Sequence, residues 1–112
     1  MKLIIREYVT SAGRDPFREW LDTLAASVKA RIQARVLRFE IGNLGDHKTV
    51  GGGVWEARLM FGPGYRIYFG KASRTTIVLL LGGDKESQSK NIHRARSYWS
   101  DYLEVTQHGK TQ

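Results

Sequence analysis

Apolar and polar residues alternate along residues 54–83, and this alternation predicts a β-hairpin followed by a third strand. The residues that share one apolar face of the hairpin are Trp55, Ala57, Leu59 and Phe61 in the first arm and Tyr65, Ile67 and Phe69 in the second. The opposite face carries Glu56, Arg58 and Met60 in the first arm and Arg66 and Tyr68 in the second. The hairpin therefore has one face suited to a core and one that is polar.

The FGPGY segment between the two arms predicts a tight turn, because its glycines can adopt the positive φ of a reversal. We expect Phe61 to pair with Tyr65, since the apolar faces then coincide and a shift by one residue breaks the match. In this register Arg58 faces Tyr68, and Arg66 is its diagonal neighbour, about 7 Å away at the backbone. Two like charges this close favour an anion between them.

Upstream of the hairpin, the pattern predicts one strand and two helices. Residues 2–9 read as the strand, and Asp15 followed by Pro16 predicts a helix start with an Asp N-cap and a Pro at the first helical position. Ser27 is expected to cap the second helix, and Gly42 with Asn43 to end it. The arginines on or beside the polar side of that helix are Arg31, Arg35 and Arg38.

The other segments complete an α+β fold with the order β-αα-βββ-α. Residues 44–53 are polar and rich in glycine and are predicted to be a loop, because the spacing of a phosphate-binding P-loop is missing. Residues 75–81 are apolar on both faces, as in a covered central strand. Asp84 is expected to cap a final helix to about Leu103, with a polar tail over 104–112. The prediction is a mostly antiparallel sheet packed on an N-terminal helical hairpin and a C-terminal helix.

The length of 112 residues predicts a single domain over residues 1–112. The chain contains no cysteine, which excludes disulfides and thiolate chemistry. We find neither a signal peptide nor a membrane-spanning run, so the expected location is the cytoplasm, without membrane association.

The formal net charge of +7 and a pI near 10.0 narrow the expected partners. A positive field of this kind attracts nucleic acid, anionic membrane or an acidic protein. The alternative is a basic surface that serves only solubility. The basic residues between positions 57 and 100 are Arg58, Arg66, Lys71, Arg74, Lys85, Lys90, Arg94 and Arg96, against the acidic Asp84 and Glu86.

Arg58, Arg66 and Lys85 are the candidates for chemistry. Lys85 follows the central strand near the positive N-terminal end of the final helix, so three cations are expected to converge on a phosphate. Glu56 is either a general base or, more often in such a setting, a salt-bridge partner of the neighbouring arginine. Tyr68 could stack on a base or donate a hydrogen bond. The alternative for the whole group is a solvated basic sheet face.

The histidines do not indicate a metal site. They stand at positions 47, 93 and 108, in a loop, on the last helix and in the tail, and no carboxylate completes a ligand pattern with them. We therefore expect no metal and no cofactor.

Two segments carry a resemblance to a known family. VWEARLMFGPGYRIYF and IVLLLGGDKESQSKNIHRARSYW resemble the RelE/ParE toxin superfamily, in particular its addiction-module killer proteins, which are related to HigB-like toxins. The resemblance covers essentially the whole chain, including the helix start at Asp15-Pro16-Phe17. It implies the toxin of a type II toxin–antitoxin system, with a helix-turn-helix antitoxin as partner.

By this resemblance the protein would be a ribosome-dependent messenger RNA endoribonuclease, an mRNA interferase that arrests growth. In RelE-like members the RNA 2′-hydroxyl attacks its own phosphate. Arg66 matches a catalytic arginine, Arg58 a basic position of the preceding strand, and Lys85 a basic residue after the central strand. Glu56 stands where RelE has a basic residue, and Asn91 or a neighbour stands where RelE has its catalytic tyrosine. The candidate RNA-binding residues are Lys48, Tyr68, Lys90 and Arg94.

Two other functions stay open: a ParE-like toxin that acts on DNA gyrase without nuclease activity, and a basic binding module without enzymatic activity. The arrangement of the three cations separates them from a nuclease. Cations within about 10 Å of one another in an open concavity favour catalysis, whereas scattered or salt-bridged cations favour binding alone.

Overall fold

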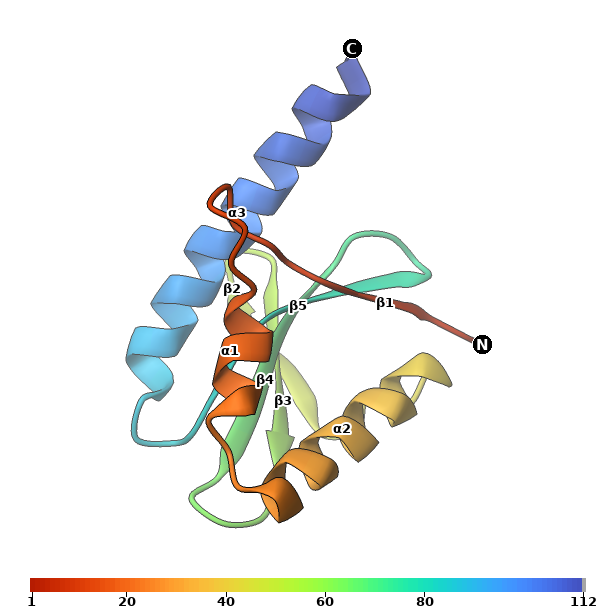
Figure 1. The fold of residues 1–112 in the computed structure, drawn as a ribbon. Coiled ribbons are helices and arrows are strands. Elements are labelled where there is room, and N and C mark those ends of the chain that lie inside the picture. Colours follow the sequence, from red (N-terminus) through yellow and green to blue (C-terminus); the bar gives the residue numbers. More distant parts are fainter. Residues whose placement is uncertain (112) are drawn as a thin grey trace.

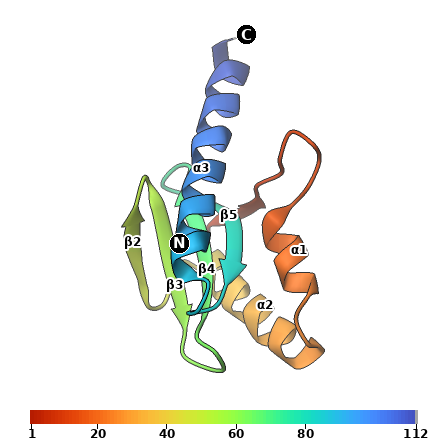
Figure 2. The same cartoon turned by 90° about the vertical axis from the view of Figure 1, so that its left-hand side faces the viewer.

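A five-stranded mixed sheet runs through the molecule, with helices on both faces (Figures 1 and 2). The computed structural model describes the backbone of residues 1–111 and the side chains of residues 1–107. The elements, in chain order, are β1 (Ile4–Glu7), α1 (Pro16–Asp22), α2 (Ala26–Glu40), β2 (His47–Gly51), β3 (Val54–Leu59), β4 (Tyr65–Lys71), β5 (Thr76–Gly83) and α3 (Gln88–Thr111). This confirms the α+β class.

The strand order in the sheet is β1-β5-β4-β3-β2. Strand β1 pairs with β5 in parallel, and all other neighbours are antiparallel. The N-terminal strand therefore joins beside β5, a position that the sequence pattern leaves undetermined. Strand β5 is buried on both faces, as its continuous apolar run predicts.

Strand β2 is an addition to the predicted order, because residues 44–53 were expected to form a loop. Residues 47–49 pair with β3, and the pairing shifts by one residue between Thr49 and Gly51. Gly51, Gly52 and Gly53 all have positive φ and make the reversal into β3. An edge strand with mostly exposed, polar residues lacks the alternation that identifies a strand, which is why the prediction failed here.

The register of the β3–β4 hairpin differs from the prediction by two residues. Leu59, not Phe61, pairs with Tyr65, and Arg58 lies directly opposite Arg66. The turn is longer than expected, and the amide of Gly64 donates to the carbonyl of Phe61 inside it (3.2 Å). A shift by an even number of residues keeps each side chain on its face, so the predicted faces are correct although the pairs are not.

Each face of the sheet has its own apolar core. Helices α1 and α2 cover one face, where Phe39 of α2 packs on Phe69 of β4 with ring centroids 5.4 Å apart. This confirms the predicted packing of the hairpin on the N-terminal helices. Helix α3 covers the other face, where Tyr68 lies in a second cluster with Trp99. The hairpin face predicted to be polar is thus largely covered by a helix.

Two glycines allow tryptophans to lie flat on the sheet. A Cβ at Gly82 would overlap the ring of Trp20, and a Cβ at Gly70 would overlap the ring of Trp99. Trp20 belongs to α1 and Trp99 to α3. Because a side chain at either glycine would push a helix away from the strands, these positions set how closely the layers approach.

The helix ends agree with the sequence in part. Asp15 caps α1, accepting a hydrogen bond from the amide of Arg18 (3.0 Å), as predicted. The N-cap of α2 is Ala25, so Ser27 lies inside the first turn and its predicted capping role is wrong. Helix α3 begins at Gln88, later than expected, because Asp84 instead accepts the amide of Ser87 in the preceding turn (3.0 Å).

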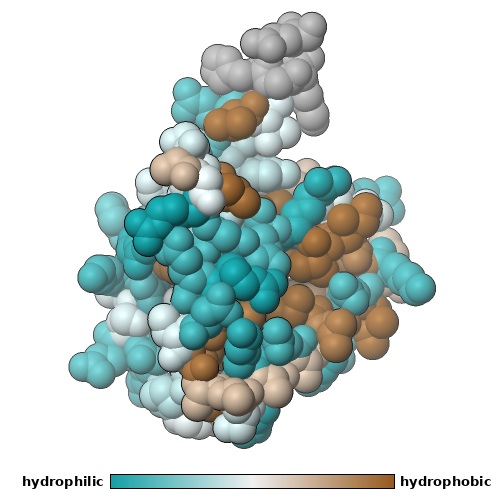
Figure 3. Space-filling view, in the orientation of Figure 1, coloured by the Kyte–Doolittle hydropathy of each residue, from teal (hydrophilic) through white to brown (hydrophobic). Residues whose placement is uncertain are grey.

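Helix α3 also continues beyond Leu103 to Thr111, and its C-terminal part extends past the sheet (Figure 1). Exposed apolar side chains gather elsewhere, on the side where β1 and α2 lie (Figure 3). They include Ile4 of β1 and Leu37 of α2. Over residues 1–111, no helix is both long and apolar enough to span a bilayer.

We predict that Leu59→Ala lowers the free energy of unfolding by about 2–5 kcal/mol, because its side chain is buried between the hairpin and the helices. Met60→Ala is the matched control, since the adjacent side chain is 81% exposed. Urea denaturation of both variants measures the difference. Equal midpoints for the two variants would show that the packing of this face is incorrect.

Candidate functional site

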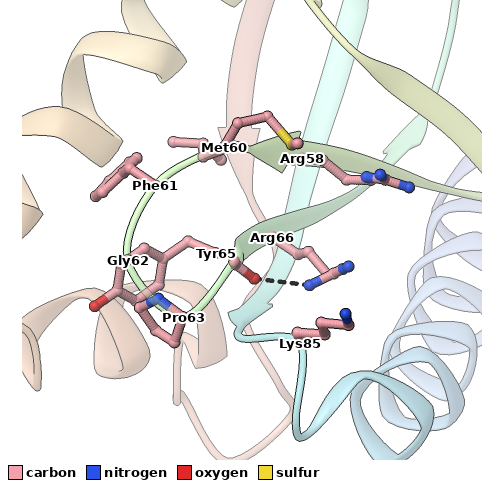
Figure 4. Close-up of a pocket in the computed structure, with 10 residues that line it drawn as sticks. Arg58, Met60, Phe61, Gly62, Pro63, Tyr65, Arg66 and Lys85 are labelled. Carbon is pink, nitrogen blue, oxygen red and sulfur yellow. Dashed lines mark hydrogen bonds between the residues drawn. The ribbon is translucent and has the colours of Figure 1, made fainter.

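An open hollow of about 590 Å³ lies where the β3–β4 turn meets the segment after β5 (Figure 4). The basic residues that line it are Arg58, Arg66 and Lys85. These are the residues in which the sequence indicates chemistry, and the fold brings all of them to one concave surface. Figure 4 shows their side chains extending toward the same side of the hairpin.

Each cation is positioned by a different element. Arg58 and Arg66 are direct neighbours on paired strands. The amide of Lys85 donates to the carbonyl of Pro63 (3.3 Å), which ties the segment after β5 to the turn. Gly64 leaves room for this approach, because a Cβ there would lie 3.3 Å from Nη1 of Arg66 and 3.4 Å from Cβ of Lys85.

Arg66 is the most rigidly held of the three. Its side chain is 9% exposed, and Nη1 donates to the carbonyl of Gly64 (2.7 Å). Nε lies 3.5 Å from Oε2 of Glu56, which is fully buried. One hydrogen bond and one ion-pair contact thus hold the guanidinium, although Nε is buried without a hydrogen-bond partner. Nη2 donates no hydrogen bond to a described residue.

Glu56 is an ion-pair partner of Arg66, its diagonal neighbour on β4, and not of Arg58. Its Oε2 also accepts a hydrogen bond from Nε2 of Gln88 (2.9 Å), in the first turn of α3. Solvent does not reach the carboxylate, which disfavours a general-base role and favours a structural one. Gln88 therefore links the start of α3 to the arginine of the hollow.

Tyr68 is also buried under α3, so it cannot stack on an RNA base, and this prediction is wrong. Burial raises the pKa of the Tyr68 hydroxyl, and the nearby charge of Glu56 raises it further. The expectation failed because a tyrosine on a polar face was assumed to be solvated.

Arg58 is half-buried, and its Nε lies 3.7 Å from Oδ2 of Asp46. Because Asp46 is largely exposed, this is a weak surface ion pair. Lys85 is exposed and forms no ion pair with a described side chain. The hollow therefore combines one fixed cation, one partly neutralised cation and one free cation.

The predicted RNA-binding residues Lys48, Lys90 and Arg94 do not line this hollow. Lys48 is exposed on β2, opposite Glu56, and Lys90 is exposed on α3. Arg94 donates to the hydroxyl of Tyr98 (2.9 Å) and lines a different hollow, between α1 and α3. These three residues add positive charge elsewhere on the surface, and the basic lining of the hollow consists of Arg58, Arg66 and Lys85.

Asn91, which occupies the region matched to the catalytic tyrosine of RelE, also lies in the hollow between α1 and α3. Its Nδ2 donates to Oγ of Ser87 (2.7 Å). Among the described residues, no group of three histidine, cysteine, aspartate or glutamate side chains could hold a metal ion. The side chain of His108 lies outside the described residues.

Two contributors to the site were missed by the sequence analysis. Gln88 could be recognised only once Glu56 was known to lie beneath α3, because a buried carboxylate requires a donor. Arg35 was predicted to lie on or beside the polar side of α2, without a contact to the hairpin, but Nη1 donates to the carbonyl of Arg58 (3.1 Å). Its position next to the hairpin follows from tertiary packing and has no local signal.

The chain is similar to an uncharacterized protein of Haemophilus influenzae, with 42% identity over 81 residues. The aligned region covers 71% of this chain and 82% of that protein. The chain belongs to the family of this Haemophilus protein. No family model matches it. Because this relative is uncharacterized, the comparison assigns no function, and the proposal below relies on the geometry of the hollow.

We predict that Arg66→Ala lowers the free energy of unfolding by about 3–5 kcal/mol, because it leaves the buried carboxylate of Glu56 without its cation. The double variant Glu56→Gln/Arg66→Gln removes both charges and should recover most of this loss. Denaturant titration of both proteins measures the two effects. An Arg66→Ala protein as stable as the wild type would contradict the buried pair.

Proposed function

We propose that the protein is the toxin of a type II toxin–antitoxin system and acts as a ribosome-dependent messenger RNA endoribonuclease in the cytoplasm. The observation that carries the proposal is the convergence of Arg58, Arg66 and Lys85 on one open hollow. Its support from sequence is the resemblance to RelE-like toxins of the addiction-module killer group. On this proposal the fold is RelE-like, with β2 added at the sheet edge.

The chemistry suits a phosphoryl transition state. When the RNA 2′-hydroxyl attacks the adjacent phosphate, negative charge develops on the phosphate oxygens, and preorganised cations stabilise that charge. Arg66 can present Nη2, because the contacts with Gly64 and Glu56 are made by Nη1 and Nε. Lys85 is free to approach a second oxygen, and Arg58 can reach a neighbouring phosphate.

The hollow offers few side chains that could transfer protons in the proposed cleavage reaction. Its lining contains no histidine and no carboxylate. An enzyme that receives its RNA already aligned by the ribosome needs less of its own acid–base catalysis, since orientation alone can supply about 7–11 kcal/mol in favourable cases. The composition of the hollow thus fits a ribosome-dependent reaction better than a free-standing nuclease.

A second function, toxicity by binding alone as in the ParE-like action on gyrase, is favoured by one observation. Arg66 is ion-paired with Glu56 and Arg58 with Asp46, so two of the three cations are partly neutralised. Paired cations suit a docking surface as well as a catalytic one. A toxicity test with separate stability controls distinguishes the two functions.

We predict that Glu56→Gln/Arg66→Gln abolishes growth arrest and lowers ribosome-bound message cleavage by about 10²–10³-fold, the usual cost of one preorganised charge. Glu56→Gln alone is the matched control, because it retains the arginine and tests whether the carboxylate reacts. Primer extension on translated messages after induction measures cleavage, and circular dichroism confirms folding.

Arg58→Ala and Lys85→Ala should reduce cleavage to a lesser degree, and Arg74→Ala, on the exposed turn before β5, should leave it unchanged. A folded Glu56→Gln/Arg66→Gln protein that still arrests growth fully would refute the nuclease. In that case inhibition of gyrase by the purified protein becomes the decisive assay.

We also propose that a helix-turn-helix antitoxin neutralises the protein by covering the basic hollow, since a positive cleft attracts acidic segments. Co-purification with the product of the adjacent gene, at low and at high salt, is expected to yield a complex whose affinity falls with Lys85→Ala and Arg58→Ala. The absence of a complex at both salt concentrations would count against an antitoxin encoded next to this protein.

A further inference from the structure

A second basic hollow adjoins the candidate site on the other side of the hairpin tip. It has a volume of about 380 Å³ and lies between α2 and the start of the β3–β4 turn. The two hollows share Leu59, Met60 and Phe61 as a common wall. The basic residues of the second hollow are Arg31, Arg35 and Arg38.

These arginines carry positive charge that no ion pair among the described side chains balances. The guanidinium carbon of Arg31 lies 3.6 Å from the centroid of the Phe61 ring, which orients Arg31 at the wall. Burial and the charge of Arg38 lower the pKa of Arg35, and the charge of Asp46 opposes this shift only in part.

Arg35 connects the two hollows physically. Its Nη1 donates to the carbonyl of Arg58, whose side chain lines the first hollow, and Nη2 donates to the carbonyl of Leu44 (both 3.1 Å). Its Nε is buried without a partner. The pairing of β2 with β3 ends at Ala57, and the amide of Arg58 then donates to the carbonyl of Asp46 (2.9 Å), so β2 does not cover the edge of the chain beyond Arg58.

Met60 stands at this uncovered edge, between the hollows, with 81% of its surface exposed. Figure 4 shows it between α2 and Arg58, at the rim of the first hollow. Met60 and Phe61 both line the apolar wall between the two hollows, which we call the apolar crest, and this crest offers a surface on which a base can rest. Positive charge on both sides of an apolar crest is an arrangement suited to an extended single strand.

We infer that the second hollow is a phosphate-binding subsite for a single-stranded RNA that also occupies the first hollow. The strand would pass around Met60, with a phosphate near Arg31 and Arg38 and another near Arg66 and Lys85. This inference rests on the proposed function and adds to it a second contact with the RNA substrate, at a phosphate other than the reacting one. An acidic polypeptide is the competing occupant, and it lacks bases to place on the apolar crest.

The experiment compares Arg31→Gln/Arg38→Gln with Arg6→Gln/Arg74→Gln, a control with the same change in net charge. All four arginines are exposed, and Arg6 and Arg74 lie in β1 and the β4–β5 turn, away from the hairpin tip. Fluorescence anisotropy measures binding of 2′-O-methyl oligouridylates of three and nine nucleotides. These probes cannot be cleaved through the 2′-hydroxyl, so binding is tested whether or not the protein is a nuclease.

For the nonamer, Arg31→Gln/Arg38→Gln is expected to lose about tenfold in affinity and to flatten the slope of log K against log salt by about 0.7, the value for the one phosphate that the two arginines hold. The trimer should be little affected, and the control should lose less than half as much in log affinity. Asp46→Asn, which removes the carboxylate beside Arg58, should tighten nonamer binding.

Equal losses for the control and the test variant would overturn the subsite, as would equal losses for trimer and nonamer. Competition by polyglutamate as effective as by oligouridylate would overturn it in favour of an acidic protein. The predicted binding pattern in a protein that cleaves no ribosome-bound message would uphold the subsite and refute the nuclease.

Discussion

The buried ion pair between Glu56 and Arg66 is the interaction on which the candidate site depends. A carboxylate with no exposed surface is costly unless a cation and hydrogen-bond donors surround it. Arg66 supplies the cation, and Gln88 supplies a donor from α3. The strand hairpin and the C-terminal helix therefore meet at one charged contact, and this contact fixes the position of Arg66 in the hollow.

The packing of the layers supports this contact from both sides of the sheet. Trp20 lies over Gly82 on one face and Trp99 over Gly70 on the other, so helices approach the strands closely at each position. Strand β5 is buried on both faces, and β4, which carries Arg66, is its neighbour in the sheet and also lies between the two cores. The hollow is open, yet Arg66, which lines it, is buried.

Much of this arrangement could be predicted from the sequence, for physical reasons that are local. Alternation identified the hairpin faces, the apolar run identified β5, and Asp15 identified the start of α1. Convergence of the three cations also followed, because face assignment survives an error of two residues in register. These features depend on periodicity and on capping, which a single chain displays.

What could not be predicted depends on contacts between distant segments. The polar strand β2 lacks apolar–polar alternation, and only its pairing with β3 identifies it. The hairpin register is a local exception, because it is set by the length of a turn that contains its own hydrogen bond. The burial of Tyr68 and Glu56 required knowledge that α3 covers their face. Arg35 was misplaced for the same reason, since its hydrogen-bond partners come from other segments.

The Glu56–Arg66 pair has a consequence for how this protein could lose its activity in a cell. A substitution that removes the arginine leaves a charged group in the interior, and the resulting chain spends more time unfolded. Proteases and chaperones act on such chains, so the abundance of the altered protein falls together with its activity. A silent but well-folded form then requires two coordinated changes, at Glu56 and at Arg66. Single substitutions at Arg66 that arise spontaneously would accordingly lower the amount of folded protein more often than they would yield a folded but inactive protein.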